Sequence, residues 1–223
     1  MSPPAPCRIA PSILSADFAD LATAIDRISG ETSLLHVDVM DGHFVPNLTI
    51  GPPVVAAINR HTEMTLDCHL MMTNPGEYLE AFRKAGADWI SVHVEVDDTA
   101  ALIAEMRALG VNPGLAINPE TPFEAIEPWV AQVSHVLVMT VHPGFGGQSF
   151  MEEVVPKIRQ VAKAAYDSGT LVEVDGGIDP QTIGLTAEAG ARCFVAGQAV
   201  FGQADPAGAV RTLRDAAAAA IGG

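Results

Sequence analysis

Short β-favouring segments alternate with helical segments along the whole chain, and this alternation constrains the fold more than any other feature. Apolar runs rich in Val, Ile and Leu recur eight times, about 28 residues apart on average in a chain of 223 residues. A strand, a helix and their connections occupy such a length, so the pattern predicts eight βα units. The strands are expected to begin near Arg8, Leu34, Met64, Asp88, Asn112, His135, Leu171 and Arg192.

The segments between the predicted strands carry helix-start residues. Four of them open with a capping residue before proline, at Asn74, Thr121, Asp179 and Asp205. Helices are therefore expected at residues 17–29, 52–60, 75–85, 98–109, 122–129, 151–167, 180–189 and 206–219. Because no linker or change in composition divides these units, we expect one domain over residues 1–223.

Eight consecutive βα units favour an α/β fold of the (β/α)₈ TIM barrel type, near its lower size limit of about 200 residues. A doubly wound open sheet is the alternative arrangement of such units. It is the second choice because the chain has no glycine fingerprint of a dinucleotide-binding fold.

The composition favours a folded protein that acts on small molecules. Hydrophobic residues make up 48% of the chain and charged residues 17%, so a sizeable core is expected. The net charge of −15 disfavours binding to nucleic acids and to anionic membranes. An anionic substrate would therefore need a local site of backbone amides or metal.

The cysteines and the start of the chain point to the cytoplasm. Cys7, Cys68 and Cys193 are widely spaced and form no CxxC pair, which is typical of a reducing compartment. Residues 2–6 lack the basic and apolar regions of a signal peptide. No apolar run approaches the length of a membrane span. We expect a cytoplasmic protein that makes no membrane contact.

Histidine and aspartate side chains fall where predicted strands end. His36 and Asp38 share one face of the second strand, His69 ends the third and Asp175 ends the seventh. In a barrel these strand ends meet at one mouth, so the four side chains can converge there. Two imidazoles and two carboxylates suit a divalent transition metal, with Zn²⁺ as first choice and Fe²⁺, Mn²⁺ or Co²⁺ as alternatives. Taken alone, His36 and Asp38 are equally well explained as a buried hydrogen-bonded pair.

The two aspartates also suggest proton transfer. Two carboxylates on opposite sides of a small substrate can remove and return a proton at either face of one carbon. A metal beside them can polarise a carbonyl and stabilise an enediolate. This chemistry predicts inversion at a carbon next to a carbonyl, with Asp38 and Asp175 as acid and base.

Two further groups of residues lie at the same predicted strand ends. Glycines cluster at residues 143–148, 176–177 and 197, where backbone N–H groups can approach a phosphate. The alternative is that these glycines only make tight turns. Met40, Met71 and Met139 end three strands and can shield an enediolate from water, although methionine at such positions is usually core packing.

Several segments together carry a family resemblance. They are IAPSILSADF at residues 9–18, HVDVMDGHFVPN at 36–47, HLM at 69–71, MTV at 139–141, PGFGGQ at 143–148 and VDGGI at 174–178. In these segments the chain resembles the ribulose-phosphate 3-epimerase family of the pentose phosphate pathway. The resemblance runs from about residue 9 to residue 201, nearly the whole chain.

The resemblance implies a barrel of the ribulose-phosphate-binding type that interconverts D-ribulose 5-phosphate and D-xylulose 5-phosphate with one bound divalent metal ion. It implies His36, Asp38, His69 and Asp175 as metal ligands, with the two aspartates as acid and base. It also implies a homo-oligomer, either a dimer or a hexamer. The residues it assigns to substrate binding are Ser12, His69, Gly144, Phe145, Gly146, Gly147, Asp175, Gly176, Gly177, Gly197 and Gln198.

One position departs from the family pattern and keeps other functions open. Gln198 stands where the family usually has a serine that contacts phosphate, so the preference for pentose over hexose phosphate is open. An allulose 6-phosphate 3-epimerase is therefore an alternative, and a non-catalytic sugar-phosphate-binding barrel is another. A decarboxylase typically needs a catalytic lysine at a strand end, whereas Lys84, Lys157 and Lys163 fall in predicted helices.

Overall fold

Eight parallel strands form the centre of the fold in the computed structural model, which describes residues 7–96 and 98–222. Each strand begins within one residue of its predicted start. The strands are β1 (Arg8–Pro11), β2 (Leu34–Met40), β3 (Thr65–Met71), β4 (Trp89–His93), β5 (Asn112–Ile117), β6 (His135–Met139), β7 (Leu171–Asp175) and β8 (Cys193–Ala196).

The strand order makes the sheet a nearly closed barrel. Neighbouring strands follow one another from β2 to β8, and β8 then pairs in parallel with β1. A parallel bridge between Ser12 and His36 joins the end of β1 to β2. The predicted (β/α)₈ barrel is confirmed, and the doubly wound open sheet is wrong, because an open sheet would leave β1 and β8 unpaired or reverse the strand order in the middle.

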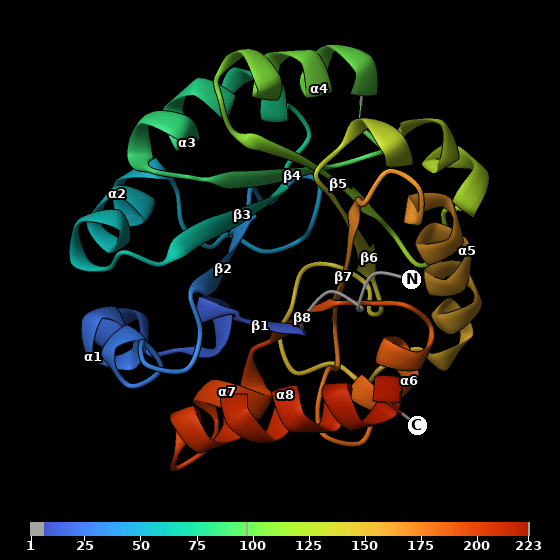
Figure 1. The fold of residues 1–223 in the computed structure, drawn as a ribbon. Coiled ribbons are helices and arrows are strands. Elements are labelled where there is room, and N and C mark those ends of the chain that lie inside the picture. The colour runs from blue at the N-terminus through green and yellow to red at the C-terminus, as the bar shows by residue number, and fades with distance from the viewer. Residues whose placement is uncertain (1–6, 97, 223) are drawn as a thin grey trace.

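Helices surround the strands, as Figure 1 shows. They are α1 (Leu21–Asp26), α2 (Pro52–His61), α3 (Leu79–Ala85), α4 (Thr99–Ala108), α5 (Val155–Ala165), α6 (Ile183–Glu188), α7 (Gln198–Phe201) and α8 (Pro206–Gly222). Short 3₁₀ turns precede or replace helices at η1 (Ile13–Ser15), η2 (Phe18–Asp20), η3 (Pro75–Glu77), η4 (Phe123–Ala125), η5 (Glu127–Gln132) and η6 (Glu152–Val154).

The helix predicted at residues 122–129 is wrong. The segment between β5 and β6 forms only the 3₁₀ turns η4 and η5. Pro128 would lie inside such a helix, where it has no N–H to donate and its ring clashes with the preceding turn. The helix predicted from residue 180 begins at Ile183 instead, because Asp179 Oδ1 accepts hydrogen bonds from the backbone of Gln181 and Thr182 in a preceding turn.

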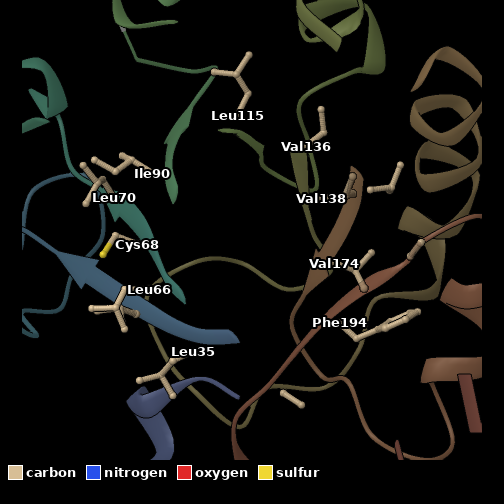
Figure 2. Packing of buried hydrophobic residues seen from close by; sticks show 14 of the residues in the cluster. Leu35, Leu66, Cys68, Leu70, Ile90, Leu115, Val136, Val138, Val174 and Phe194 are labelled. Atoms are coloured by element: carbon tan, nitrogen blue, oxygen red, sulfur yellow. The ribbon is translucent and has the colours of Figure 1, made fainter. Parts of the chain in front are cut away.

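Alternation along the strands separates an apolar outer layer from a polar interior. Leu66, Cys68 and Leu70 of β3 are fully buried and point away from the barrel axis (Figure 2). Phe82 of α3 belongs to the same apolar cluster. Burying a side chain of this size stabilises the fold by roughly 1.5–3 kcal/mol. The residues between them, such as Asp67 and His69, face the barrel axis.

The predicted domain boundaries include residues 1–6, 97 and 223, which lie outside the described residues, so the single domain stays a prediction. Within the described parts of the chain, every helix is too short or too polar to cross a bilayer.

Candidate active site

Four predicted site residues come together at the C-terminal ends of the strands. His36 and Asp38 lie on β2, His69 on β3 and Asp175 at the end of β7. Each offers a nitrogen or oxygen atom, and these atoms all lie within 4.8 Å of one another. Asp38 is directly opposite His69 in the β2–β3 register, and this pairing brings two of the four side chains together. We call these four residues the His–Asp cluster.

The His–Asp cluster has the donor atoms that a divalent transition metal requires. His36 Nε2 lies 3.4 Å from Asp38 Oδ1, and His69 Nδ1 lies 3.3 Å from the same oxygen. His69 Nδ1 is also 4.0 Å from Asp175 Oδ2. Among residues 7–96 and 98–222, the buried His36 Nε2 finds no hydrogen-bond partner. A buried nitrogen without a hydrogen-bond partner costs free energy. A cation bound in the cluster would supply the missing partner of His36 Nε2.

The two carboxylates of the cluster differ in their affinity for a proton. Burial and the negative charge of Asp38 raise the pKa of Asp175 to about 7. Burial would also raise the pKa of Asp38, but the adjacent His36 and His69 outweigh it and hold that pKa below its ordinary value. Ser12 Oγ donates a hydrogen bond of 2.5 Å to Asp38 Oδ2. Pairs of carboxyl groups with such different pKa values are typical of acid/base sites.

The two histidines of the cluster differ as well. Burial lowers the pKa of His69 to about 4, so the ring is neutral at neutral pH and has a lone pair for a ligand. Burial would lower the pKa of His36 too, but the carboxylates of Asp38 and Asp67 raise it well above its ordinary value. His36 Nδ1 is 2.7 Å from Asp67 Oδ2, and this contact leaves Nε2 directed at the cluster.

A cavity of about 1060 Å³ opens next to the cluster. Asp38 and Asp175 form part of its wall, whereas His36 and His69 are fully buried and do not line it. Every other predicted substrate-binding residue lines the cavity: Ser12, Gly144, Phe145, Gly146, Gly147, Gly176, Gly177, Gly197 and Gln198.

Glycines contribute a second part of the cavity lining, which we call the glycine wall: Gly144, Gly146, Gly147, Gly176, Gly177 and Gly197. At Gly176, φ is +122° and a Cβ would lie 2.5 Å from Val141 Cγ2. At Gly177, φ is +63° and a Cβ would lie 2.5 Å from the backbone nitrogen of Phe150. Gly176 and Gly177 are therefore required by the tight turn itself. A phosphate site is compatible with this turn, because the lack of side chains leaves their backbone close to the cavity.

The three predicted methionines line the cavity and are also packed. Met40, Met71 and Met139 are each at most 4% exposed. Met40 and Met71 form one apolar cluster with Val45. Both interpretations of these residues are thus compatible with their positions.

A hydrogen bond joins the loop after β2 to the loop after β6, which lines the cavity. Asn47 lies in the loop after β2 and Gly144 in the loop after β6. Asn47 Nδ2 donates a hydrogen bond of 2.9 Å to the carbonyl oxygen of Gly144. Gln148 Nε2 donates to the carbonyl oxygens of His142 and Phe145 and so holds the second loop in a compact turn. The cavity is therefore bounded by loops that hydrogen bonds connect.

Residues outside the predicted site support the cluster. His93 Nε2 lies 2.8 Å from His69 Nε2, and Glu95 Oε2 lies 3.0 Å from His93 Nδ1. Asp67 contacts His36. The strand alternation contains a usable signal, because Asp67 is two residues before His69 and therefore shares its face. His93 lies on the next strand of the sheet.

Fold and site together define an enzyme of the (β/α)₈ barrel class, because ionisable side chains and a cavity of about 1060 Å³ lie at the C-terminal end of the strands. The sequence model of the Ribulose-phosphate 3 epimerase family matches residues 8–201. The chain belongs to the ribulose-phosphate 3-epimerase family and is a carbohydrate epimerase.

Individual relatives agree with this assignment. The cytoplasmic isoform of ribulose-phosphate 3-epimerase from Oryza sativa subsp. japonica is 49% identical over 220 residues, which cover 96% of this chain and 96% of that protein. Ribulose-phosphate 3-epimerase from Bacillus subtilis is 48% identical over 215 residues, which cover 93% of this chain and 98% of that protein.

Solved structures of other enzymes share the fold. KGPDC from Streptococcus mutans has a TM-score of 0.72 at 15% identity, covering 96% of this chain and 98% of that chain. 3-Hexulose-6-phosphate synthase from Salmonella typhimurium has a TM-score of 0.71 at 16% identity, covering 96% and 99%. At such identities the likeness concerns the barrel alone.

Proposed function

We propose that the protein interconverts D-ribulose 5-phosphate and D-xylulose 5-phosphate by epimerisation at C3. Relatives of nearly half-identical sequence carry that name. The observation that carries the mechanism is the His–Asp cluster, where two carboxylates of unequal proton affinity border one cavity. Asp38 and Asp175 would act as acid and base, and all four residues of the cluster would hold one divalent metal ion.

The chain's own residues can carry out the proton transfers. One aspartate in its ionised form removes the proton from C3, and the other in its protonated form returns a proton to the opposite face. The Ser12 hydroxyl orients Asp38 by donating to Oδ2. Met40, Met71 and Met139 would exclude water from the enediolate, because their side chains on the cavity wall offer no proton.

A bound divalent ion supplies Lewis-acid polarisation of the substrate carbonyl, which makes the adjacent C–H proton more acidic. Two nitrogen and two oxygen donors suit Zn²⁺ first, and Fe²⁺, Mn²⁺ or Co²⁺ as well. His36 and His69 would bind through Nε2 and Nδ1 respectively, since these are the atoms that face Asp38.

The glycine wall would bind the phosphate group. The chain carries a net charge of −15, so a dianionic group needs local backbone N–H donors. Gly176, Gly177, Gly197 and Gln198 line the cavity on the side of β7 and β8, where barrels of this class commonly hold phosphate. Residues 144–147, Phe145 among them, would contact the substrate from the loop after β6.

We also propose a cytoplasmic homo-oligomer, a dimer or a hexamer, that binds neither nucleic acid nor membrane. The strongly acidic composition supports the lack of nucleic-acid binding. Cys7, Cys68 and Cys193 are free thiols, which supports a reducing compartment. The rice relative is named as a cytoplasmic isoform.

A second candidate is epimerisation of a ketohexose 6-phosphate such as allulose 6-phosphate. Gln198 on the cavity wall favours considering it, because this residue replaces the usual serine near the phosphate end. A non-catalytic sugar-phosphate-binding barrel is less consistent with the site, since binding alone requires no pair of acids in the cavity.

Proton exchange at C3 tests the proposal directly. The protein is treated with a chelator, reloaded with Zn²⁺, Fe²⁺, Mn²⁺ or Co²⁺, and incubated with D-ribulose 5-phosphate in deuterated water. We expect metal-dependent deuterium incorporation at C3 in the wild type, and loss of net epimerisation to D-xylulose 5-phosphate in both Asp38→Asn and Asp175→Asn. Asp26→Asn, which alters an exposed pair with His61, is the matched control. Substrate binding without any exchange would identify a binding module and overturn the proposal.

A further inference from the structure

The two histidines of the His–Asp cluster are supported in different ways. His36 uses Nδ1 to contact a carboxylate directly, Asp67 Oδ2 at 2.7 Å. His69 uses Nε2 to contact another imidazole, His93 Nε2 at 2.8 Å. The usual partner of a ligating histidine is a carboxylate, a backbone carbonyl or a water molecule, so the second arrangement is less common. The Nε2 atom of His93 can either donate or accept a hydrogen bond, depending on its tautomer. Which of the two it does decides where the proton of His69 lies.

The two rings meet at their edges. Their planes differ by 26° and their centroids are 5.0 Å apart, while the two Nε2 atoms are only 2.8 Å apart. The nitrogens therefore point at one another nearly in the plane of both rings, as a hydrogen bond requires. Because both rings are almost completely buried, water cannot replace either partner.

Glu95 fixes the other end of this chain of contacts. Its Oε2 lies 3.0 Å from His93 Nδ1, and its Oε1 accepts a hydrogen bond of 2.8 Å from the backbone N–H of Asn118. Burial would raise the pKa of Glu95, but hydrogen bonds from His93 and Thr121 outweigh it and lower that pKa. The carboxyl group is therefore ionised at neutral pH and can only accept.

The direction of each hydrogen bond follows from that charge. The ionised Glu95 accepts from Nδ1–H of His93, so His93 Nε2 carries the lone pair. His69 must then donate its Nε2–H to His93, which leaves His69 Nδ1 unprotonated. That nitrogen lies 3.3 Å from Asp38 Oδ1 and 4.0 Å from Asp175 Oδ2, inside the cluster.

We propose that His93 and Glu95 are positioning residues that hold His69 in its Nε2–H tautomer and so set the affinity of the His–Asp cluster for its metal ion. The inference rests on the proposed metal site and extends it to two residues outside the cluster. Phe44 packs on His93 with ring centroids 4.6 Å apart, so the imidazole is confined on that side as well.

A competing contact makes the proposal specific. In the metal-free protein the carboxylate of Asp38 could also accept a hydrogen bond from an Nδ1–H of His69, across 3.3 Å. The contact with His93 is shorter, at 2.8 Å. We therefore expect the hydrogen bonds from His69 to His93 and from His93 to Glu95, which we call the relay, to prevail over the contact with Asp38. Without His93, the proton of His69 should move to Nδ1, where an incoming metal ion must displace it.

Three variants test this relay. His93→Leu removes the acceptor at similar volume, His93→Gln restores an oxygen that can accept from His69, and Glu95→Gln removes the charge that sets the direction of the bonds. Affinity for Zn²⁺ and Co²⁺ is measured by chelator competition. We expect a loss of about 10- to 100-fold in His93→Leu and a clearly smaller loss in His93→Gln. Glu95→Gln should lie between them.

The tautomer is read independently of activity. Nitrogen-15 NMR of the metal-free protein should show His69 protonated at Nε2 in the wild type and at Nδ1 in His93→Leu. His61→Leu is the matched control, because it removes a histidine paired with a carboxylate, Asp26, far from the cluster. It should change neither the tautomer of His69 nor the metal affinity.

The outcomes separate this inference from the proposed function. If the wild type binds no divalent ion, or if Asp38→Asn binds it equally well, the proposed metal site itself fails. If the wild type binds metal through the cluster but His93→Leu keeps both the Nε2–H tautomer and the wild-type affinity, only the relay is overturned. Thermal unfolding of each variant shows whether its fold is intact.

Discussion

One side of the cavity is formed by functional side chains, whereas the other is formed mainly by glycine backbone. On one side, β2 places Asp38 on the cavity wall, and His36 and His69 lie buried behind it, where further side chains hold them by hydrogen bonds. On the other side, the glycine wall presents backbone, and Gly176 and Gly177 have left-handed φ values. The first side depends on the chemical identity of each residue, and the second on the shape of the chain. Substitutions on the two sides should therefore fail in different ways.

The largest effect is expected from the acids. Asp38→Asn and Asp175→Asn should each lower kcat for epimerisation by about 10²- to 10⁴-fold, because an amide can neither remove nor return the C3 proton. Single-turnover rates on metal-saturated protein measure the effect apart from weakened metal binding. Turnover close to that of the wild type in either variant would rule out the scheme with two carboxylates. Circular dichroism checks that the barrel is intact.

The next largest effect concerns Asp67, which lies behind His36 on the side of the cavity formed by side chains. Asp67→Asn keeps an oxygen that can accept from His36 Nδ1 but removes the charge, and should weaken metal binding by about 10- to 100-fold. Isothermal titration with Zn²⁺ measures this loss, and metal-saturated kcat should recover much of its value. Because Asp67 is fully buried, the thermal midpoint must be compared in parallel. An unchanged affinity would show that His36 needs no carboxylate behind it.

A third substitution should affect the glycine side alone. Gly176→Ala places a Cβ 2.5 Å from Val141 Cγ2 at φ +122°, so the turn after β7 must shift or strain by about 1–3 kcal/mol. We expect a higher KM and a lower thermal midpoint while the Zn²⁺ affinity stays within about threefold of the wild type. Gly110→Ala is the matched control, since it also has positive φ, +73°, but open space around the added Cβ. A fall in metal affinity equal to the rise in KM would show that the two sides are not separable.

The same contrast explains what could be predicted from the sequence. Strand starts were predictable because period-two apolar patterns are local, and the convergence of His36, Asp38, His69 and Asp175 was predictable because strand ends of a barrel meet at one mouth. The contact between His93 and His69 was not, since it depends on the direction the His93 ring takes across to β3. For residues 122–129, the capping signal at Thr121 predicts a helix, but Pro128 prevents one and the segment forms 3₁₀ turns.

The smallest effect concerns Gln198, which offers both a backbone N–H and a polar side chain next to the glycine wall. Its backbone begins α7 directly after Gly197, and its side chain lies against Gly202, where an added Cβ would be 2.3 Å from Gln198 Nε2. If backbone N–H groups hold the phosphate, Gln198→Ser should change KM for D-ribulose 5-phosphate by less than about threefold, since only a replaceable side-chain contact is lost. Paired kinetics with a ketopentose 5-phosphate and a ketohexose 6-phosphate measure this. A reversal of preference between these two substrates would instead make the glutamine side chain the element that selects substrate length, and would place side-chain recognition on the glycine side as well.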